Sequence, residues 1–418
     1  MPRLLTLLCL LPLLPAEVSP TSSLVSAFLY GWYATPSTDG RWSHWNHSLL
    51  PHWTASVRER YPEASWRPPA DLHSPFYPLG GPYSSADVAH LRGQLAAMRG
   101  AGIDAAVVSW WGRAGVSSGD SQGVRTEAFL ARVFAAADAA AVAAVRVAPH
   151  LEPYAGRDAA SVRADIAALS AAHGASPSWL RVGGRRVFFV YDSYHLPSAE
   201  WARLLSPGGD LTVRGDAALD GFFIGLWLER DHGADLAAGF FDGAYTYFAS
   251  AGFSFGSTPA HWPAMRAEAD AAGLLFVPCV GPGYDDTRIR PWNAAATRAR
   301  EAGGYYSRMW AAALAAQPTA VGVTSWNEWG EGTQIEPAEP RAVDVAALAP
   351  AGRALDAHTR AVIGAKDVYE DYAPGGPHFY LELTRKFAGE LAAQVAAAAE
   401  EEGEENGGGR GDGQRHEL

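Results

Sequence analysis

Cysteine is almost missing from this chain, which has two among 418 residues. Cys9 lies in an apolar N-terminal segment, so removal of that segment would leave Cys279 alone. No disulfide within the mature chain can therefore hold the fold, whatever the compartment. Stability has to come from buried apolar side chains, and a chain that is 48% hydrophobic can form one large core or two domains.

Several functional signatures are also absent. The sequence has no Gly-x-x-x-x-Gly-Lys-Ser/Thr loop, no His-Glu-x-x-His pair and no Cys-x-x-Cys pair. Nucleotide and zinc sites therefore lack an anchor, and we expect no metal and no other cofactor. The chain also lacks an excess of positive charge. Its formal net charge of −12 argues against a nucleic-acid partner. Residues 252–256 match the Gly-x-Ser-x-Gly pattern of serine esterases, but Pro259 follows where a helix should begin, which disfavours that interpretation.

The two ends of the chain differ from the rest. Residues 1–20 carry Arg3 and then a short apolar run, which is typical of a signal peptide or a short signal anchor. We therefore expect the protein to lie in the lumen of the secretory pathway (Golgi or ER) or to be secreted. Any contact with a membrane would be made only through such an anchor. Residues 400–418 are acidic and glycine-rich, which predicts a disordered tail. The final Glu-Leu matches an ER retrieval signal only weakly.

Eight apolar runs alternate with segments of helical periodicity over most of residues 24–390, which we expect to form one domain. The expected strands are 26–33, 103–111, 144–154, 186–195, 221–227, 241–248, 274–280 and 320–326. The expected helices are 86–100, 127–141, 158–172, 199–205, 263–272 and 297–316, with a C-terminal helix from 380 toward 399. This alternation predicts an α/β fold, a (β/α)8 barrel, better than an open doubly wound sheet.

Polar or aromatic residues follow nearly every apolar run. In a barrel those strand ends meet at one mouth, so long strand-to-helix loops are expected to form an active site there. The segment 34–83, rich in Trp, His and Pro, is long enough to be functional or a lid.

The most informative stretch is 320–337, where an apolar run leads into Glu328 and Glu331. Tryptophans and glycines frame these two glutamates. Mutual repulsion and apolar neighbours would raise their pKa values, so that one carboxyl stays protonated while the other ionises. Cleavage of a glycosidic bond needs such an acid/base pair. A solvated acidic loop is the alternative interpretation, but the preceding strand and the tryptophans favour a site.

A series of motifs follows the order of the chain from about 27 to 390. They are Tyr30-Gly-Trp-Tyr33, Trp45-Asn-His47, Phe76-Tyr-Pro78, Ser109-Trp-Trp111, His150-Leu-Glu-Pro-Tyr154, Tyr191-Asp-Ser-Tyr194, Phe241-Asp-Gly-Ala-Tyr-Thr-Tyr-Phe248, Gly281-Pro-Gly-Tyr-Asp-Asp-Thr-Arg-Ile-Arg-Pro-Trp-Asn293, Trp326-Asn-Glu-Trp-Gly-Glu-Gly-Thr-Gln-Ile-Glu336 and Tyr380-Leu-Glu-Leu-Thr-Arg-Lys386. With this series the chain resembles glycoside hydrolase family 99, the endo-α-1,2-mannosidases and endo-α-1,2-mannanases.

This resemblance implies that 24–390 is a catalytic (β/α)8 barrel. It would cleave an internal α-1,2-mannosidic bond with retention and without a metal. Glu331 would be the general acid and then the base that activates water. Glu328 would deprotonate the substrate's 2-hydroxyl, which closes onto C1 as a 1,2-anhydro sugar; in a manno-sugar the axial 2-hydroxyl lies trans to an α leaving group. The implied substrate-binding residues are Tyr33, Trp111, Glu152, His195, Tyr247, Asn327 and Trp329.

Two positions depart from the family pattern. Trp111 agrees with bacterial members, whereas animal members tend to have Tyr there, so glucosyl versus mannosyl preference stays open. Gly330 stands where animal members carry a His between the glutamates. We expect a monomer that releases Glc-Man or Man-Man from glucosylated or plain high-mannose N-glycans or N-glycoproteins. The alternatives are a conventional two-carboxylate glycosidase on another α-glycan, and an inactive mannose-binding lectin on the same barrel.

Overall fold

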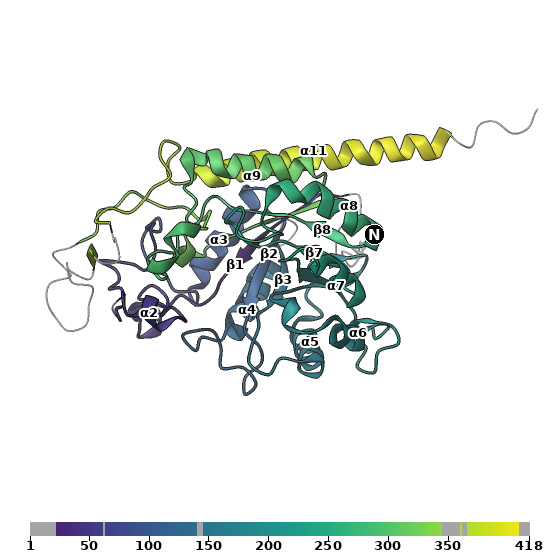
Figure 1. The fold of residues 1–418 in the computed structure, drawn as a ribbon, viewed down its shortest axis with the longest axis horizontal. Coiled ribbons are helices and arrows are strands. Elements are labelled where there is room, and N and C mark those ends of the chain that lie inside the picture. The colour runs from purple at the N-terminus through teal and green to yellow at the C-terminus, as the bar shows by residue number, and fades with distance from the viewer. Residues whose placement is uncertain (1–21, 62, 140–144, 345–359, 362–365, 409–418) are drawn as a thin grey trace, which may run out of the picture.

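The computed structural model describes residues 22–61, 63–139, 145–344, 360–361 and 366–408 (Figure 1). The expected signal segment, 1–20, lies outside this part. Within it, no helix combines the length and the apolar character needed to cross a membrane.

A parallel sheet closes on itself to form the barrel at the centre of Figure 1. Its strand order is β8-β7-β6-β5-β3-β2-β1-β10-β9. The strands at the two ends of this order, β8 (Leu275–Val277) and β9 (Cys279–Val280), belong to one apolar run that Pro278 divides. Because β8 pairs with β7 while β9 pairs with β10, this run closes the ring. The expected (β/α)8 class is confirmed.

The remaining strands lie near the expected runs but are shorter. They are β1 (Leu24–Leu29), β2 (Ala105–Trp110), β3 (Arg146–Leu151), β5 (Arg185–Val190), β6 (Gly221–Leu226), β7 (Gly243–Tyr245) and β10 (Ala320–Val323), with β4 (Arg181–Val182) antiparallel to β5. The expected run 186–195 ends early, because the backbone turns at Asp192 (φ 46°) into the 3₁₀ helix η2 (Ser193–His195).

Helices surround the sheet. They are α3 (Val88–Gly100), α4 (Glu127–Ala139), α5 (Ala159–His173), α6 (Ser198–Leu205), α7 (His232–Ala238), α8 (Trp262–Ala272) and α9 (Gly304–Ala315), with α11 (Phe379–Gly408) alongside α9 in Figure 1. Local sequence explains their starts: Asp87 caps α3 by accepting hydrogen bonds from two backbone N–H groups, and Asp158 forms a capping box with Ser161 at α5.

Two helix boundaries differ from those expected by more than two residues. The helix predicted for 297–316 begins only at Gly304, because Ala302 (φ 47°) and Gly303 (φ 88°) leave helical geometry. The C-terminal helix continues to Gly408, into the segment 400–418 expected to be disordered. Glutamate is a good helix former, and five glutamates lie between positions 400 and 405. Residues 409–418 lie outside the described part of the chain.

The long segment after β1 packs against the barrel. Trp45 and Trp66 are fully buried, and their indole N–H groups donate to the carbonyls of Tyr83 (2.7 Å) and Arg288 (2.6 Å). This segment also contains the short helices α1 (Pro36–Asp39) and α2 (Ala55–Arg58). Buried aromatic side chains therefore hold residues 34–83, the wall segment, against the barrel.

Candidate active site

The turn after β10 carries both glutamates and is fixed by hydrogen bonds. The backbone N–H of Glu328 donates to Ser325 Oγ (2.7 Å), and the backbone N–H of Ser325 donates to Thr333 O (2.9 Å). A 3₁₀ helix, η6 (Trp329–Glu331), connects the two glutamates and ends at Gly332, whose φ of 62° suits glycine. A short, closed loop at the carboxyl end of a barrel strand thus positions the pair.

Burial dominates the electrostatics of the pair. Desolvation raises the pKa of Glu328 well above its ordinary value, and the neighbouring charge of Glu331 raises it further. Desolvation also raises the pKa of Glu331, but Arg290, whose Nη1 lies 3.2 Å from Glu331 Oε1, opposes this. The pair therefore retains a proton more readily than ordinary glutamates, as the sequence predicted.

Arg290 belongs to an acidic cluster that sequence reasoning missed. Its Nη1 lies 3.1 Å from Asp286 Oδ2 as well as near Glu331. Asp286 is fully buried and accepts hydrogen bonds from the Tyr284 hydroxyl (2.9 Å) and Asn293 Nδ2 (3.0 Å). Tyr284, Asp286, Arg290 and Asn293 all lie in the 281–293 motif, and its two aspartates followed by two arginines were the available signal.

Tyr33, Asn327 and Trp329 hold the glutamate turn to β1. The Tyr33 hydroxyl donates to Asn327 O (2.8 Å) and accepts from the Trp329 backbone N–H (3.2 Å). The Asn327 amide exchanges two hydrogen bonds with the backbone of Tyr30 (2.8 and 2.9 Å). Trp329 is fully buried and donates from Nε1 to Glu336 (3.0 Å). In this structure these side chains support the turn, and their contact with substrate stays a prediction.

Glu152 and Tyr247 approach the pair from other strands. Glu152 follows β3 and accepts a hydrogen bond from Ser109 Oγ (2.8 Å), and its charge contributes to the raised pKa of Glu328. The Tyr247 hydroxyl forms a short hydrogen bond with that of Tyr30. Burial raises the pKa of Tyr247 well above its ordinary value, with smaller contributions from both glutamates. The ends of β1, β3, β7 and β10 thus converge on one site.

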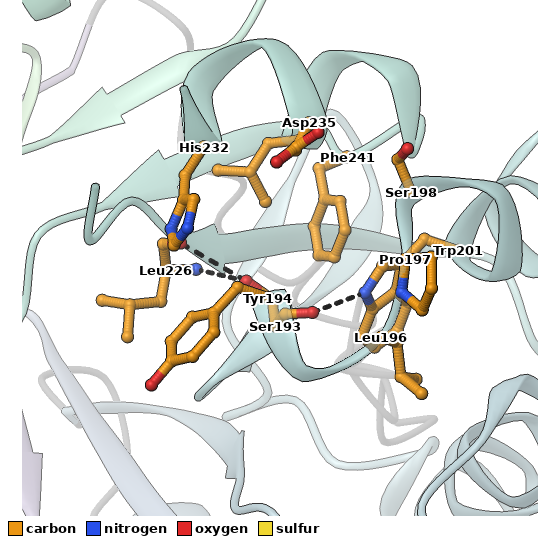
Figure 2. A pocket seen from close by; sticks show the side chains of 11 residues that line it. Ser193, Tyr194, Leu196, Pro197, Ser198, Trp201, Leu226, His232, Asp235 and Phe241 are labelled. Atoms are coloured by element: carbon orange, nitrogen blue, oxygen red, sulfur yellow. Dashed lines mark hydrogen bonds between the residues drawn. The ribbon is translucent and has the colours of Figure 1, made fainter. Parts of the chain in front are cut away.

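The structure does not bring Trp111 and His195 into contact with the pair. Trp111 is half-buried, and its indole Nε1 has no hydrogen-bond partner among the described residues. His195 is exposed at the end of η2, with its ring edge-on to Tyr194 at 4.8 Å. Tyr194 and His232, whose ring centroids are 5.1 Å apart, line a separate cavity of about 180 Å³ (Figure 2). None of the predicted site residues lines this cavity.

Gly330, between the glutamates, makes room for His73. A Cβ atom at position 330 would lie 2.8 Å from Cδ2 and 3.0 Å from Nε2 of His73, and 3.4 Å from Cδ1 of Ile289. His73 is 1% exposed, so its ring has no space into which to retreat. The departure at Gly330 therefore has a physical reason, because the imidazole of His73 occupies the volume that a side chain at 330 would need.

Gly330→His should overpack this site. We expect a loss of about 1–3 kcal/mol in the free energy of unfolding and at least a tenfold fall in kcat, since the turn carrying both glutamates must shift. Adding His73→Gly should restore most of both, which thermal unfolding and turnover of a mannose glycan would measure. Gly93→His, in an exposed helix position with nothing within 4 Å, is the control. A Gly330→His protein with unchanged kinetics would show that the turn tolerates the side chain.

The chemistry available here is proton transfer by the buried carboxyl of Glu328 and the partly buried carboxyl of Glu331, whose side chain is 23% exposed. Within the described part of the chain, no group of three or more His, Cys, Asp or Glu side chains could hold a metal ion. One turn thus carries two carboxyls that can act as acid and base, and Arg290 hydrogen-bonds to one of them, Glu331. This arrangement suits hydrolysis of a glycosidic bond.

Known proteins share this architecture. The family model of glycosyl hydrolase family 99 matches residues 20–349. Glycoprotein endo-alpha-1,2-mannosidase of Rattus norvegicus is 37% identical over 377 residues, 89% of this chain and 76% of that protein. The glycoprotein endo-alpha-1,2-mannosidase-like protein of Homo sapiens is 39% identical over 379 residues, 90% of this chain and 77% of that protein. The solved GH99 endo-alpha-mannosidase of Bacteroides thetaiotaomicron is 36% identical and superposes with a TM-score of 0.75, covering 88% of this chain and 98% of that one. The chain thus belongs to glycosyl hydrolase family 99 and is a glycoside hydrolase.

Proposed function

We propose that this protein is a retaining endo-α-1,2-mannosidase. It cleaves an internal α-1,2-mannosidic bond in high-mannose N-glycans and releases Glc-Man or Man-Man. The observation that carries the proposal is the Glu328–Glu331 pair on the turn after β10, in which both pKa values are raised and Arg290 hydrogen-bonds to Glu331. The relatives named endo-alpha-1,2-mannosidase support the choice of linkage.

The reaction proceeds in two steps, each of which inverts C1. In the first, the 2-hydroxyl oxygen of the mannose bonds to C1 as the bond to the leaving oxygen breaks. Glu328 takes the hydroxyl proton, and Glu331 gives its proton to the leaving group. In the second, water attacks C1 of the 1,2-anhydro sugar and the C1–O2 bond breaks, while Glu331 takes the water proton and Glu328 returns a proton to O2. Two inversions give net retention, and the carboxyls finish as they began.

Substrate has to redistribute the proton on the pair. In the free protein, Arg290 lies beside Glu331, and the pKa of Glu328 is raised more strongly than that of Glu331. Both effects favour the proton on Glu328. A 2-hydroxyl that donates a hydrogen bond to Glu328 stabilises its ionised form and lowers its pKa. The negative charge then on Glu328 raises the pKa of Glu331. Binding of the correct sugar thus prepares both groups.

We further propose that the enzyme works as a monomer in the lumen of the secretory pathway or outside the cell. The leader-like segment 1–20 supports this placement, as does the similarity to enzymes whose names specify glycoproteins. Glycans of secretory glycoproteins are then its substrates.

The decisive experiment incubates purified protein with monoglucosylated Man9 N-glycan and with unglucosylated Man9, and identifies the products by mass. Release of Glc-Man establishes endo-cleavage next to a glucosylated mannose. Release of Man-Man from the second glycan alone keeps the mechanism and shows a mannosyl preference. Binding of both glycans with no release would overturn the proposal in favour of a lectin.

Trp111→Tyr should change this preference. We expect the ratio of kcat/KM for the two glycans to change about tenfold, because a phenol replaces a larger indole where the sugar next to the cleaved mannose would lie. Measuring both glycans with one preparation cancels any loss of folded protein. An unaltered ratio would show that Trp111 lies outside that subsite.

A further inference from the structure

An aromatic group on the wall segment is not explained by the catalytic pair. Trp53 is 78% exposed, the most exposed large hydrophobic side chain among the described residues. Its ring stacks on His52 (centroids 3.9 Å apart, 28°) and meets Trp292 edge-on (5.2 Å, 81°). Leaving an indole in water forgoes the free energy of burying it, so a preformed, exposed group of this kind indicates a binding surface.

A cavity of about 350 Å³ lies beside this group. Its lining includes His52 and Trp292, together with Ser48, Arg58, Tyr61 and Glu63. Aromatic faces thus adjoin hydroxyl, guanidinium and carboxylate groups that can donate and accept hydrogen bonds. A hexose ring needs both, because its C–H face packs on an aromatic ring while its hydroxyls bond to polar side chains. One positive and one negative side chain in the lining favour an uncharged ligand.

Hydrogen bonds tie this surface to the loop that serves the catalytic pair. The Leu50 N–H donates to Ile289 O (2.7 Å), and Trp292 Nε1 donates to Leu50 O (3.0 Å). Arg290, which bonds to Glu331, lies between these two loop residues in sequence. In Figure 1, α2, which follows Trp53, lies at the left of the molecule. The aromatic group is therefore fixed next to the active site, near the ends of the strands.

We propose that Trp53, His52 and Trp292 form an outer carbohydrate subsite. It takes a hexose of the same mannose-rich glycan, several sugars away from the bond that is cleaved. The ring stacks on Trp53, and its hydroxyls reach Arg58 and Glu63 in the cavity. This inference rests on the proposed function, since it assigns a second contact to the same substrate. It also explains why an aromatic group is held in place within 51–60, a mostly exposed stretch.

Trp53→Ala tests the subsite with the full chain. Two substrates are compared: an aryl glycoside of the released disaccharide, too short to reach the subsite, and a free Man9 glycan. We expect KM for Man9 to rise about 3- to 10-fold with kcat unchanged, and no change with the aryl glycoside, because only the long glycan loses the stacking contact. Trp53→Phe should retain most of the affinity. Phe253→Ala, which removes another exposed aromatic ring (54%), is the matched control and should change neither substrate.

Several outcomes would overturn the subsite. Equal kinetics of Trp53→Ala and the parent protein on Man9 would do so, and so would an equal loss on both substrates. A loss confined to a glycoprotein, with free Man9 unaffected, would assign the surface to polypeptide instead. If the parent protein cleaves neither substrate, the proposed function fails. Calorimetric titration with Man9 then tests the subsite separately, and equal affinity of the parent protein and Trp53→Ala would reject it.

Discussion

Glu331→Gln should lose turnover of natural glycans by about 10²–10⁴-fold, while the glycans still bind. The proposed acid donates its proton to a sugar oxygen, which is a poor leaving group without protonation. Glutamine has nearly the same shape but cannot give up a proton in this way. The measurement is product release from Man9 glycans under single-turnover conditions, with binding followed by calorimetry.

An activated substrate distinguishes loss of the acid from a general loss of function. A disaccharide with a nitrophenolate leaving group needs little protonation, so Glu331→Gln should lose much less activity toward it in the bond-breaking step. Glu339→Gln, which removes a half-buried carboxylate from the same loop, is the control and should behave as the parent protein. Unchanged turnover of natural glycans would remove Glu331 from the acid role, and an equal loss on both substrates would mean that it acts in another way.

The pH dependence of the activity also tests whether Glu331 is the general acid. A general acid must be protonated, so activity falls as the pH rises through its pKa. Burial raises the pKa of Glu331, which moves the alkaline limb of the profile to higher pH than an ordinary glutamate would give, and Arg290 partly opposes this. In Glu331→Gln this limb should disappear from the profile of the activated substrate.

The sequence could predict the barrel because apolar runs and helical periodicity are local signals. Strand positions were correct even where the strand itself was broken, as at Pro278 between β8 and β9. Boundaries depended on backbone turns that leave little trace in the sequence. For example, α9 starts only at Gly304 because Ala302 has a positive φ, and an alanine does not predict such a backbone angle.

The site could be predicted only as far as single motifs reach. Glu328 and Glu331 share one turn, so their interaction followed from spacing. The bond from Arg290 to Glu331 crosses 41 positions, and the contact of His73 with Gly330 also joins distant segments. Such pairs depend on how the loops fold over the barrel. The same limit applies to the hydrogen bond from the buried Trp329 indole to Glu336, and the contact of Trp329 with substrate stays a prediction.

Glu328→Gln should abolish turnover of both natural and activated substrates, by about 10³-fold or more, because no group remains to deprotonate the 2-hydroxyl. A better leaving group cannot compensate for a nucleophile that is never formed. The base must be ionised to act, so in the parent protein activity is lost as the pH falls through the pKa of Glu328. Burial raises that pKa, so this acidic limb should lie above the range of an ordinary glutamate. Kinetics of both substrates across pH measure each part.

Stability separates this loss from misfolding. Glu328→Gln removes a buried carboxyl that is repelled by Glu331, so the variant should unfold at the same temperature as the parent protein or higher. The activated substrate then decides the assignment of roles. If Glu328→Gln kept activity toward it while Glu331→Gln lost both substrates, the acid would be Glu328, the carboxyl that holds the proton more strongly in the free protein. A covalent sugar trapped on either glutamate would replace the 1,2-anhydro route with a conventional two-carboxylate mechanism.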